Sequence, residues 1–186
     1  MEISITKTTT PKQKPADESK LGFGQYYTDH MFIMNYDEGE GWHNPRIVPY
    51  GPFELDPAAM VLHYAQEIFE GMKAYRTADG SIQLFRPDKN MARMNVSCDR
   101  LCIPKIDEEF AIKAIKTLVE VDKDWYLHLT VLHFTSDLTY SLLTHKLVFT
   151  LQSTLHLQLF FHRSEHIIRK VSHLLKSSLN RSMFVP

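Results

Sequence analysis

The sequence lacks the features that mark several large classes of protein. No hydrophobic run approaches the roughly 20 residues that a membrane-spanning helix needs. The only cysteines, Cys98 and Cys102, are too few for a disulfide framework. Basic and acidic side chains number 21 and 22, and this near balance argues against nucleic acid or an anionic membrane as the main partner. GxGxxG, Walker A, GxSxG and HExxH motifs are also missing, so none of these common site signatures identifies a function.

Glycine is missing from the whole C-terminal third. All seven glycines and eight of the nine prolines lie before residue 126. Residues 126–186 contain no Ala and two acidic residues, but fourteen leucines and seven of the ten histidines. The net charge is −5 for residues 1–125 and +4 for residues 126–186. Because left-handed turns and helix ends usually need glycine, the two parts of the chain require separate explanations.

The first 20 residues are rich in Thr, Lys and Pro and have no hydrophobic periodicity, which predicts a flexible arm over residues 1–20. A secretory signal needs a hydrophobic segment that this stretch does not have. A mitochondrial transit peptide is rich in Arg and poor in acids, whereas this stretch has no Arg and three acids. We therefore expect a cytoplasmic protein, with a mitochondrial isoform left open.

Residues 21–125 have the patterns of an organised domain. We expect strands at 31–36 and 46–49, a short helix at 65–71, a hairpin of strands 72–76 and 82–86, a helix between Pro87 and Pro104, and a second helix after Asp107. Met91, Met94, Cys98, Leu101 and Cys102 fall on one stripe of the first long helix. Strands, a hairpin and then two helices predict an α+β layer rather than a doubly wound sheet.

The cysteines and histidines show no metal-ligand pattern. Cys98 and Cys102 are four residues apart, whereas metal or redox use favours a CxxC pair or further ligands nearby. Buried structural thiols are the favoured interpretation. His30, His43 and His63 are likewise expected to be structural, and no metal site is predicted.

Two further groups have alternatives that spacing alone leaves open. Arg93 and Arg100 are seven residues apart and share a helix face; spacing alone favours a solvated basic face, and the alternative is an anion clamp. Tyr64, Phe69 and Tyr75 are either core side chains or one wall of a hydrophobic substrate pocket.

Several short segments, in order, carry a resemblance to a known family. They are Thr28-Asp29-His30-Met31, Leu62-His63-Tyr64-Ala65, the stretch from Phe69 to Arg76, and Leu84-Phe85-Arg86-Pro87 followed by Asn90-Met91-Ala92-Arg93-Met94. This set resembles the branched-chain amino acid aminotransferases, fold type IV enzymes that depend on pyridoxal 5′-phosphate (PLP). The resemblance covers about residues 21–125 and implies the small N-terminal domain, an antiparallel sheet with helices. Other fold type IV enzymes, such as D-amino acid aminotransferase, are the alternative within the enzyme class.

The resemblance also implies roles for individual residues. Arg93 matches the arginine that binds the cofactor phosphate, which favours the anion clamp at this position. Tyr64 and Phe69 match side chains that line the pocket for a branched aliphatic substrate, and Phe23 matches a further pocket aromatic. The implied reaction is amino transfer from leucine, isoleucine or valine to 2-oxoglutarate, giving glutamate and a branched 2-oxo acid.

No catalytic residue is expected among these 186 residues, because the family places its Schiff-base lysine in a larger C-terminal domain. The enzyme hypothesis is therefore that the gene encodes a branched-chain transaminase, a homodimer when complete, of which this chain is a truncated and inactive form. The alternative is a non-catalytic fragment or pseudogene product.

The tail suggests why that larger domain is missing. Read one base out of register, residues 126–138 can encode VPSxNGTSLYIRP and residues 160–170 can encode LSPVGAYYPEG. Both strings resemble the family's own sequence at that point. We therefore expect residues 126–186 to be an out-of-frame translation without a defined fold. The alternative is a divergent extension rich in Leu and His.

Overall fold

The computed structural model describes residues 1–15, 26–52, 55–125, 134–142 and 154–163. Its strands are β1 (Ser4–Ile5), β2 (His30–Asp37), β3 (Gly41–Pro49), β4 (Glu67–Arg76), β5 (Ile82–Leu84), β6 (Phe134–Leu142) and β7 (Thr154–Arg163). Its helices are α1 (Met60–Tyr64), α2 (Pro87–Arg100) and α3 (Glu108–Val121), with a 3₁₀ turn at Lys123–Trp125.

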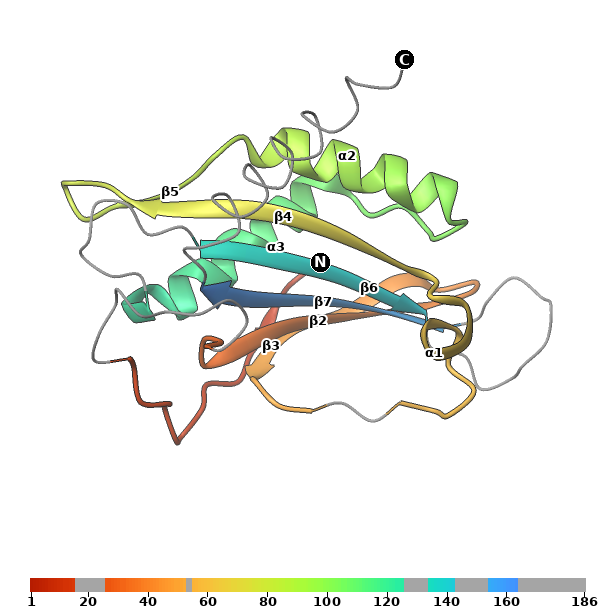
Figure 1. The fold of residues 1–186 in the computed structure, drawn as a ribbon, viewed down its shortest axis with the longest axis horizontal. Helices are drawn as coiled ribbons and strands as arrows, with labels where there is room; N and C mark the ends of the chain where they lie inside the picture. Colours follow the sequence, from red (N-terminus) through yellow and green to blue (C-terminus); the bar gives the residue numbers. More distant parts are fainter. Residues whose placement is uncertain (16–25, 53–54, 126–133, 143–153, 164–186) are drawn as a thin grey trace, which may run out of the picture.

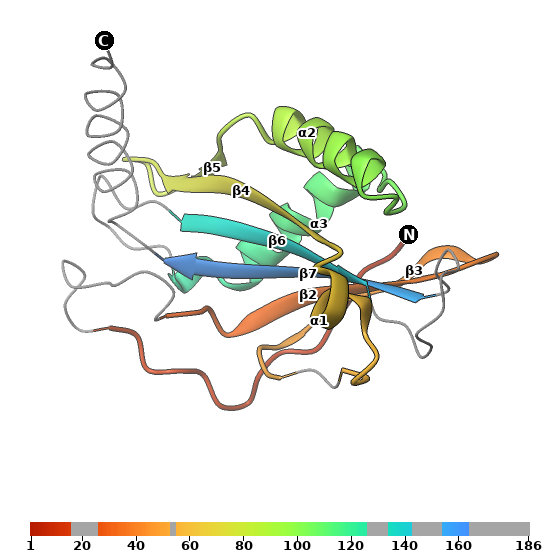
Figure 2. The same ribbon diagram turned by 45° about the vertical axis from the view of Figure 1, so that its right-hand side comes forward.

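The strands form one sheet in the order β1-β3-β2-β7-β6-β4-β5, antiparallel except where β1 runs parallel to β3. In Figure 1, α2 runs beside β4 and α3 lies behind the central strands. Figure 2 shows the same arrangement turned, with α3 behind the central strands and α2 beside β4. This combination of one sheet and covering helices confirms the predicted α+β class. No helix in the described part of the chain is long and hydrophobic enough to cross a membrane.

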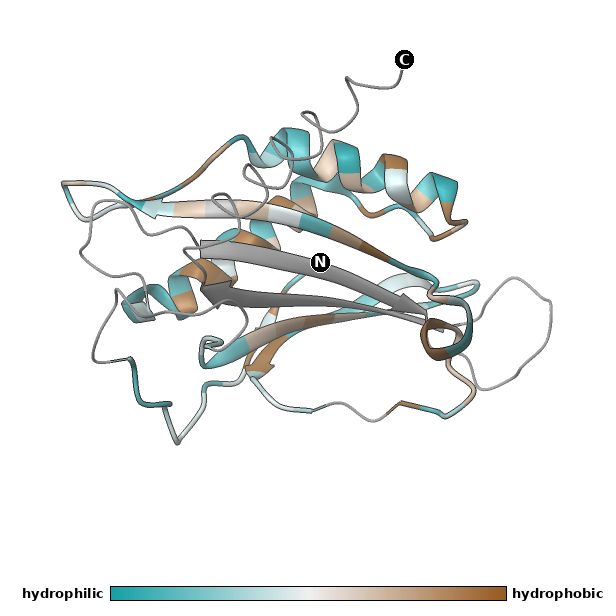
Figure 3. Cartoon of the chain, in the orientation of Figure 1, coloured by the Kyte–Doolittle hydropathy of each residue, from teal (hydrophilic) through white to brown (hydrophobic). Residues whose placement is uncertain are grey.

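The core lies between the sheet and the two long helices. Along β4, Ile68, Glu70, Met72 and Ala74 are buried, which is the two-residue alternation expected of a strand with one covered face. The sheet also contributes Phe32 and Met34 of β2 and Ile47 of β3, and the largest buried side chains of the helices are Met91, Met94, Ile115 and Leu118. Hydrophobic and hydrophilic residues are interspersed along both helices (Figure 3), as an amphipathic helix requires.

Most expected elements are present, with shifted boundaries. The clearest difference is the helix predicted at 65–71: the chain is helical at 60–64 instead, and β4 has begun by Glu67. Ala65 has a left-handed φ of 47°, which ends α1 and turns the chain into the strand. The long helix α2 confirms the predicted stripe through Met91, Met94 and Cys98.

The end of α2 differs from the prediction at the second cysteine. The helix ends at Arg100, and Leu101 and Cys102 are exposed rather than part of the buried stripe. Cys102 has a left-handed φ of 54°, so the chain leaves the helix axis before Pro104 is reached. The prediction of a buried thiol is therefore correct for Cys98 and wrong for Cys102.

The N-terminal residues 1–15 are packed against the sheet, which differs from the predicted flexible arm. β1 pairs with β3 at Ser4↔Arg46 and Ile5↔Ile47. Farther along, the Thr8 backbone N–H donates to His30 Nε2 over 2.9 Å. Composition did not indicate this packing, because the N-terminal segment makes both contacts through its backbone. The rest of the predicted arm, residues 16–20, lies outside the described residues.

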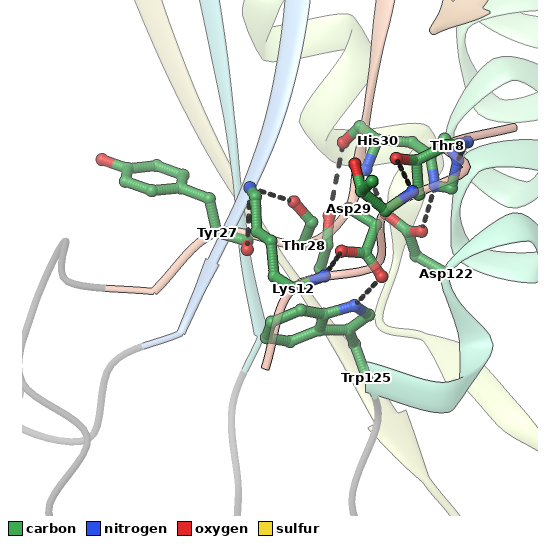
Figure 4. A network of polar contacts seen from close by, with 9 residues as sticks. Thr8, Lys12, Tyr27, Thr28, Asp29, His30, Asp122 and Trp125 are labelled. Atoms are coloured by element: carbon green, nitrogen blue, oxygen red, sulfur yellow. Dashed lines mark hydrogen bonds and ion pairs between the residues drawn. The ribbon is translucent and has the colours of Figure 1, made fainter. Parts of the chain in front are cut away.

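Lys12 connects the end of this N-terminal segment to the rest of the domain (Figure 4). Its ammonium donates to the carbonyl oxygens of Tyr27, at 3.3 Å, and Thr28, at 2.7 Å. The same ammonium lies 3.9 Å from the ring centroid of Tyr50, a cation–π contact. Its backbone N–H donates to Asp29 Oδ1 over 2.8 Å. One residue thus ties the N-terminal segment to two parts of the domain.

Residues 126–186 were expected to have no defined fold, yet they contribute β6 and β7 to the middle of the sheet. β7 pairs with β2, β6 pairs with β4, and the two strands pair with each other. Because backbone pairing needs no particular side chains, extended segments of very different sequence can fill this position. The domain boundary predicted at residue 125 therefore falls inside one sheet. The out-of-frame origin of these residues stays a prediction.

Candidate functional site

A buried carboxylate on β4 is the starting point of the candidate site. The alternation of β4 turns Glu70 towards the covered face of the sheet, where it is 4% exposed between Ile68 and Met72. An ionised group at this depth is costly unless it is paired and hydrogen-bonded. The surroundings of Glu70 must therefore supply donors.

Four donor contacts meet that need. Arg93 of α2 donates from Nε to Glu70 Oε2 over 2.8 Å and from Nη2 to Oε1. Asn90, one helical turn earlier, donates from Nδ2 to Oε1 over 2.9 Å. The Gly71 backbone N–H donates to Oε1 over 3.0 Å. The carboxylate is thus bound by the neighbouring helix and by its own strand.

The guanidinium of Arg93 is held in place yet open to solvent. Its side chain is 68% exposed, and Nη1 has no hydrogen-bond partner among the described residues. The hydrogen bonds and the charge of Glu70 raise the pKa of Arg93 above its ordinary value, so the group stays protonated. A fixed guanidinium with a free outer edge is suited to binding an anion such as a phosphate group.

Tyr64 and Phe69 lie outside the core. Tyr64, the last residue of α1, is 55% exposed, and Phe69 on β4 is 65% exposed. The core alternative for these two aromatic residues is therefore wrong. Phe69 precedes Glu70 on the strand, so the two side chains point to opposite faces of the sheet. Phe23, the third predicted pocket residue, lies outside the described residues.

Arg93 and Arg100 are not equivalent, although both lie on α2. Arg100 is the exposed last residue of the helix, about 10 Å along the axis from Arg93 at 1.5 Å per residue. Within the described part of the chain, a buried carboxylate engages Arg93 and none engages Arg100. This difference favours an anion-binding role for Arg93 and a solvated basic position for Arg100.

The sequence-based interpretation missed Glu70 and Asn90. A signal for Glu70 was present, because it occupies the position in the Ile68-x-Glu70-x-Met72 alternation where a hydrophobic residue is expected. A charged residue at such a position needs a partner. Asn90 gave no comparable signal, since an Asn near a helix start is common at the surface.

The histidines have structural partners, as predicted. His30 is buried and its Nδ1 lies 2.6 Å from Asp122 Oδ1, while His63 Nε2 lies 2.7 Å from the Pro57 carbonyl oxygen. Through His30, the motif Thr28-Asp29-His30-Met31 therefore contacts both the N-terminal segment and Asp122, which follows α3. His43 Nε2 forms a hydrogen bond of 2.5 Å with Asp37 Oδ2 across the β2–β3 turn.

His43 and Asp37 form, with Glu40, a group whose possible ligand atoms lie within 4.8 Å of one another. Two of the three residues are only partly buried and Glu40 is exposed. The His43–Asp37 hydrogen bond within the turn explains the closeness of the group without an ion.

Comparison with solved structures identifies the fold. The branched-chain aminotransferase of Thermobaculum terrenum, in its PLP form, matches 73% of this chain and 40% of its own with a TM-score of 0.54 and 15% identity. That of Thermoproteus uzoniensis, solved with norvaline, matches 69% and 39% with a TM-score of 0.52 and 16% identity. At these identities the likeness concerns the fold alone. The chain has the fold of an N-terminal portion of these aminotransferases.

Sequence comparison goes further, although no family model matches the chain. Branched-chain-amino-acid transaminase 1 of Bacillus subtilis is 58% identical over 123 residues, which are 66% of this chain and 34% of that enzyme. The corresponding enzyme of Mycolicibacterium smegmatis is 52% identical over 128 residues, 67% of this chain and 35% of its own. Over its N-terminal two thirds, the chain is similar in sequence to branched-chain-amino-acid aminotransferases. The chain spans about a third of the length of these relatives.

Proposed function

We propose that the gene specifies a PLP-dependent transaminase acting on leucine, isoleucine and valine, and that this chain supplies its small domain. The observation that carries the proposal is Arg93, fixed on Glu70 with its outer edge free. The 58% identity to a Bacillus subtilis transaminase supports the choice of reaction. We place the protein in the cytoplasm and expect the complete enzyme to be a homodimer.

The residues present fit the phosphate of PLP. Arg93 offers a permanent positive charge and free N–H groups, the chemistry that binds phosphate oxygens. When bound, PLP supplies an electron-accepting ring that lets an amino group pass between an amino acid and a 2-oxo acid. Tyr64 and Phe69 offer exposed aromatic surface suited to a branched aliphatic side chain, and Phe23 is proposed to join them.

We further propose that these 186 residues by themselves do not catalyse transamination. They span about a third of the relatives' length, and the family resemblance places the cofactor lysine in the part that they do not span. The second candidate is accordingly a non-catalytic fragment or pseudogene product, favoured by the change of composition at residue 126.

The tail is proposed to be an out-of-frame translation of family sequence. Two features of the sequence support this idea: the change of composition after Trp125, and the two segments, 126–138 and 160–170, whose shifted codons can spell family-like sequence. Reading the nucleotides across the Trp125 codon tests it directly. If the codons of residues 128–138 cannot spell GTSLYIRP in the neighbouring frame, the idea is wrong.

A domain exchange tests the proposed function. Residues 1–125 replace the matching N-terminal third of the Bacillus subtilis transaminase, and formation of glutamate from L-leucine and 2-oxoglutarate is measured. We expect the hybrid to be active, to prefer L-leucine to D-alanine, and to need far more PLP when it carries Arg93→Gln. Arg100→Gln is the matched control and should leave the PLP requirement unchanged. A folded hybrid whose PLP requirement is the same with Arg93→Gln would refute the assigned role. Separately, glutamate formation by the 186-residue chain alone would refute its proposed inactivity.

A further inference from the structure

We propose that Glu70, secured by Asn90, is a positioning residue that aims the guanidinium of Arg93 at the cofactor phosphate. The inference rests on the proposed function, which assigns the phosphate to Arg93, and adds two residues to the site. Neither residue needs to touch the cofactor. Their role is to fix the group that does.

The first step is the two-point contact. Glu70 accepts from both Nε and Nη2 of Arg93, so the plane of the guanidinium is set by the plane of the carboxylate. An arginine side chain that is 68% exposed would otherwise sample many rotamers. With Nε and Nη2 engaged, the Nη1 edge is the part that remains directed away from Glu70.

The second step is that the carboxylate is fixed independently of Arg93. Asn90 Nδ2 lies 2.9 Å from Glu70 Oε1 and 2.7 Å from the Gly71 carbonyl oxygen, so it bridges the side chain and the backbone of β4. The Gly71 N–H adds a contact of 3.0 Å to the same Oε1. Because Asn90 and Arg93 are one helical turn apart on α2, the helix also sets the distance between the bridge and the guanidinium.

The third step separates positioning from simple electrostatics. A carboxylate beside Arg93 lowers the positive potential that an incoming phosphate meets. If charge alone mattered, Glu70→Gln would tighten phosphate binding. If positioning dominates, the same change weakens binding, because the Gln side chain presents an N–H group where Arg93 needs an acceptor. The two effects have opposite signs.

The experiment uses the full 186-residue chain labelled with nitrogen-15 and follows the arginine Nε–Hε signals by NMR. The titrant is pyridoxamine 5′-phosphate, compared with pyridoxamine, which differs by the phosphate alone; neither has an aldehyde that would react with lysines. The variants are Glu70→Gln, Asn90→Ala and Arg93→Gln. Glu67→Gln, an exposed glutamate on the same strand, is the matched charge control. Exchange of the Arg93 Hε proton with water is measured in the free chain.

We expect binding that depends on the phosphate and on Arg93, about tenfold weaker in Glu70→Gln, as loss of a charged hydrogen-bond pair implies. Asn90→Ala should weaken binding less and speed Hε exchange, and Glu67→Gln should change neither. Equal or tighter binding by folded Glu70→Gln would overturn the inference and leave Arg93 as the phosphate residue. If Glu70→Gln does not fold, unchanged binding and exchange in Asn90→Ala would overturn it. Equal binding of pyridoxamine and its phosphate by the unmodified chain would refute the proposed function and the inference with it.

Discussion

Asp122, just after α3, is expected to be one of the most sensitive single positions for stability. Its Oδ1 lies 2.6 Å from His30 Nδ1, and its Oδ2 accepts from the His30 backbone N–H over 3.1 Å. Because the Thr8 N–H donates to His30 Nε2, the hydrogen of a neutral ring lies on Nδ1 and points at Asp122. Asp122 is 3% exposed, so water cannot replace it easily. The carboxylate thus satisfies two buried donors.

The expected loss follows from that count. Asp122→Ala leaves two buried donors unsatisfied, each costing about 1–3 kcal/mol, so the free energy of unfolding should fall by about 2–6 kcal/mol. That is a large part of the roughly 5–15 kcal/mol typical of a domain. Asp122→Asn should cost less, since its amide oxygen still accepts from one donor. The Asn NH₂ group then faces the second donor, and two donors cannot hydrogen-bond. If the imidazole moves its hydrogen to Nε2 to avoid this, that hydrogen faces the Thr8 N–H, which is also a donor.

Urea unfolding of the full chain, followed by tryptophan fluorescence, measures the effect. Trp125 is a suitable reporter because it is buried and its Nε1 donates to Asp29 Oδ2 over 2.8 Å. Asp124→Ala removes an exposed carboxylate two residues away and should stay within about 0.5 kcal/mol of the unmodified chain. If Asp122→Ala is no more destabilising than Asp124→Ala, the hydrogen-bond account of this site is wrong.

Three further predictions follow from local geometry. Burial raises the pKa of the Cys98 thiol to about 11, so at pH 8 a thiol reagent should label only one cysteine, the exposed Cys102, in the native chain. The Cys102→Ser variant should not be labelled, and the unmodified chain should be labelled at two cysteines after denaturation. Two reactive thiols in the native chain would contradict the burial of Cys98. Hydrogen bonds, chiefly from Thr77, lower the pKa of Asp79, so the turn is stabilised above the ordinary carboxyl pKa and loses this support as pH falls through the lowered value. Thr77→Val should raise the Asp79 titration midpoint measured by NMR, and an unchanged midpoint would refute the cause. Arg86 precedes α2 with a left-handed φ of 49° and no side-chain cap, so Arg86→Gly should raise the free energy of unfolding by up to about 1 kcal/mol; a lower urea midpoint would contradict this.

The sequence predicted what depends on neighbours along the chain. The stripe through Met91 and Met94 and the start of α3 after Asp107 depend on residues close together in the sequence. Asp107 indeed accepts from the Phe110 N–H as a cap, over 2.6 Å. The fold class followed from the same local patterns.

Contacts between distant residues were not predictable in this way. Glu70 and Arg93 meet only because α2 packs against β4, and periodicity within either element gives no sign of the pair. The packing of residues 1–15 depends on contacts with residues 27–30 and 46–50, which are distant in the sequence. Arg93 was singled out through family resemblance, whereas spacing alone favoured a solvated arginine.

The strand order has a consequence for how the chain is synthesised. β2 and β4 do not pair with each other, because β7 and β6 lie between them. When residues 1–125 have left the ribosome, β2 and β4 each still have one unpaired edge, the edge that β7 or β6 will occupy. Those edges are closed only when residue 32 meets residue 159 and residue 69 meets residue 139. Contacts so distant along the chain form slowly, which leaves exposed edges open to aggregation and chaperone binding during synthesis. A change of reading frame after Trp125 would therefore alter the strands that join the two halves of the small domain's own sheet.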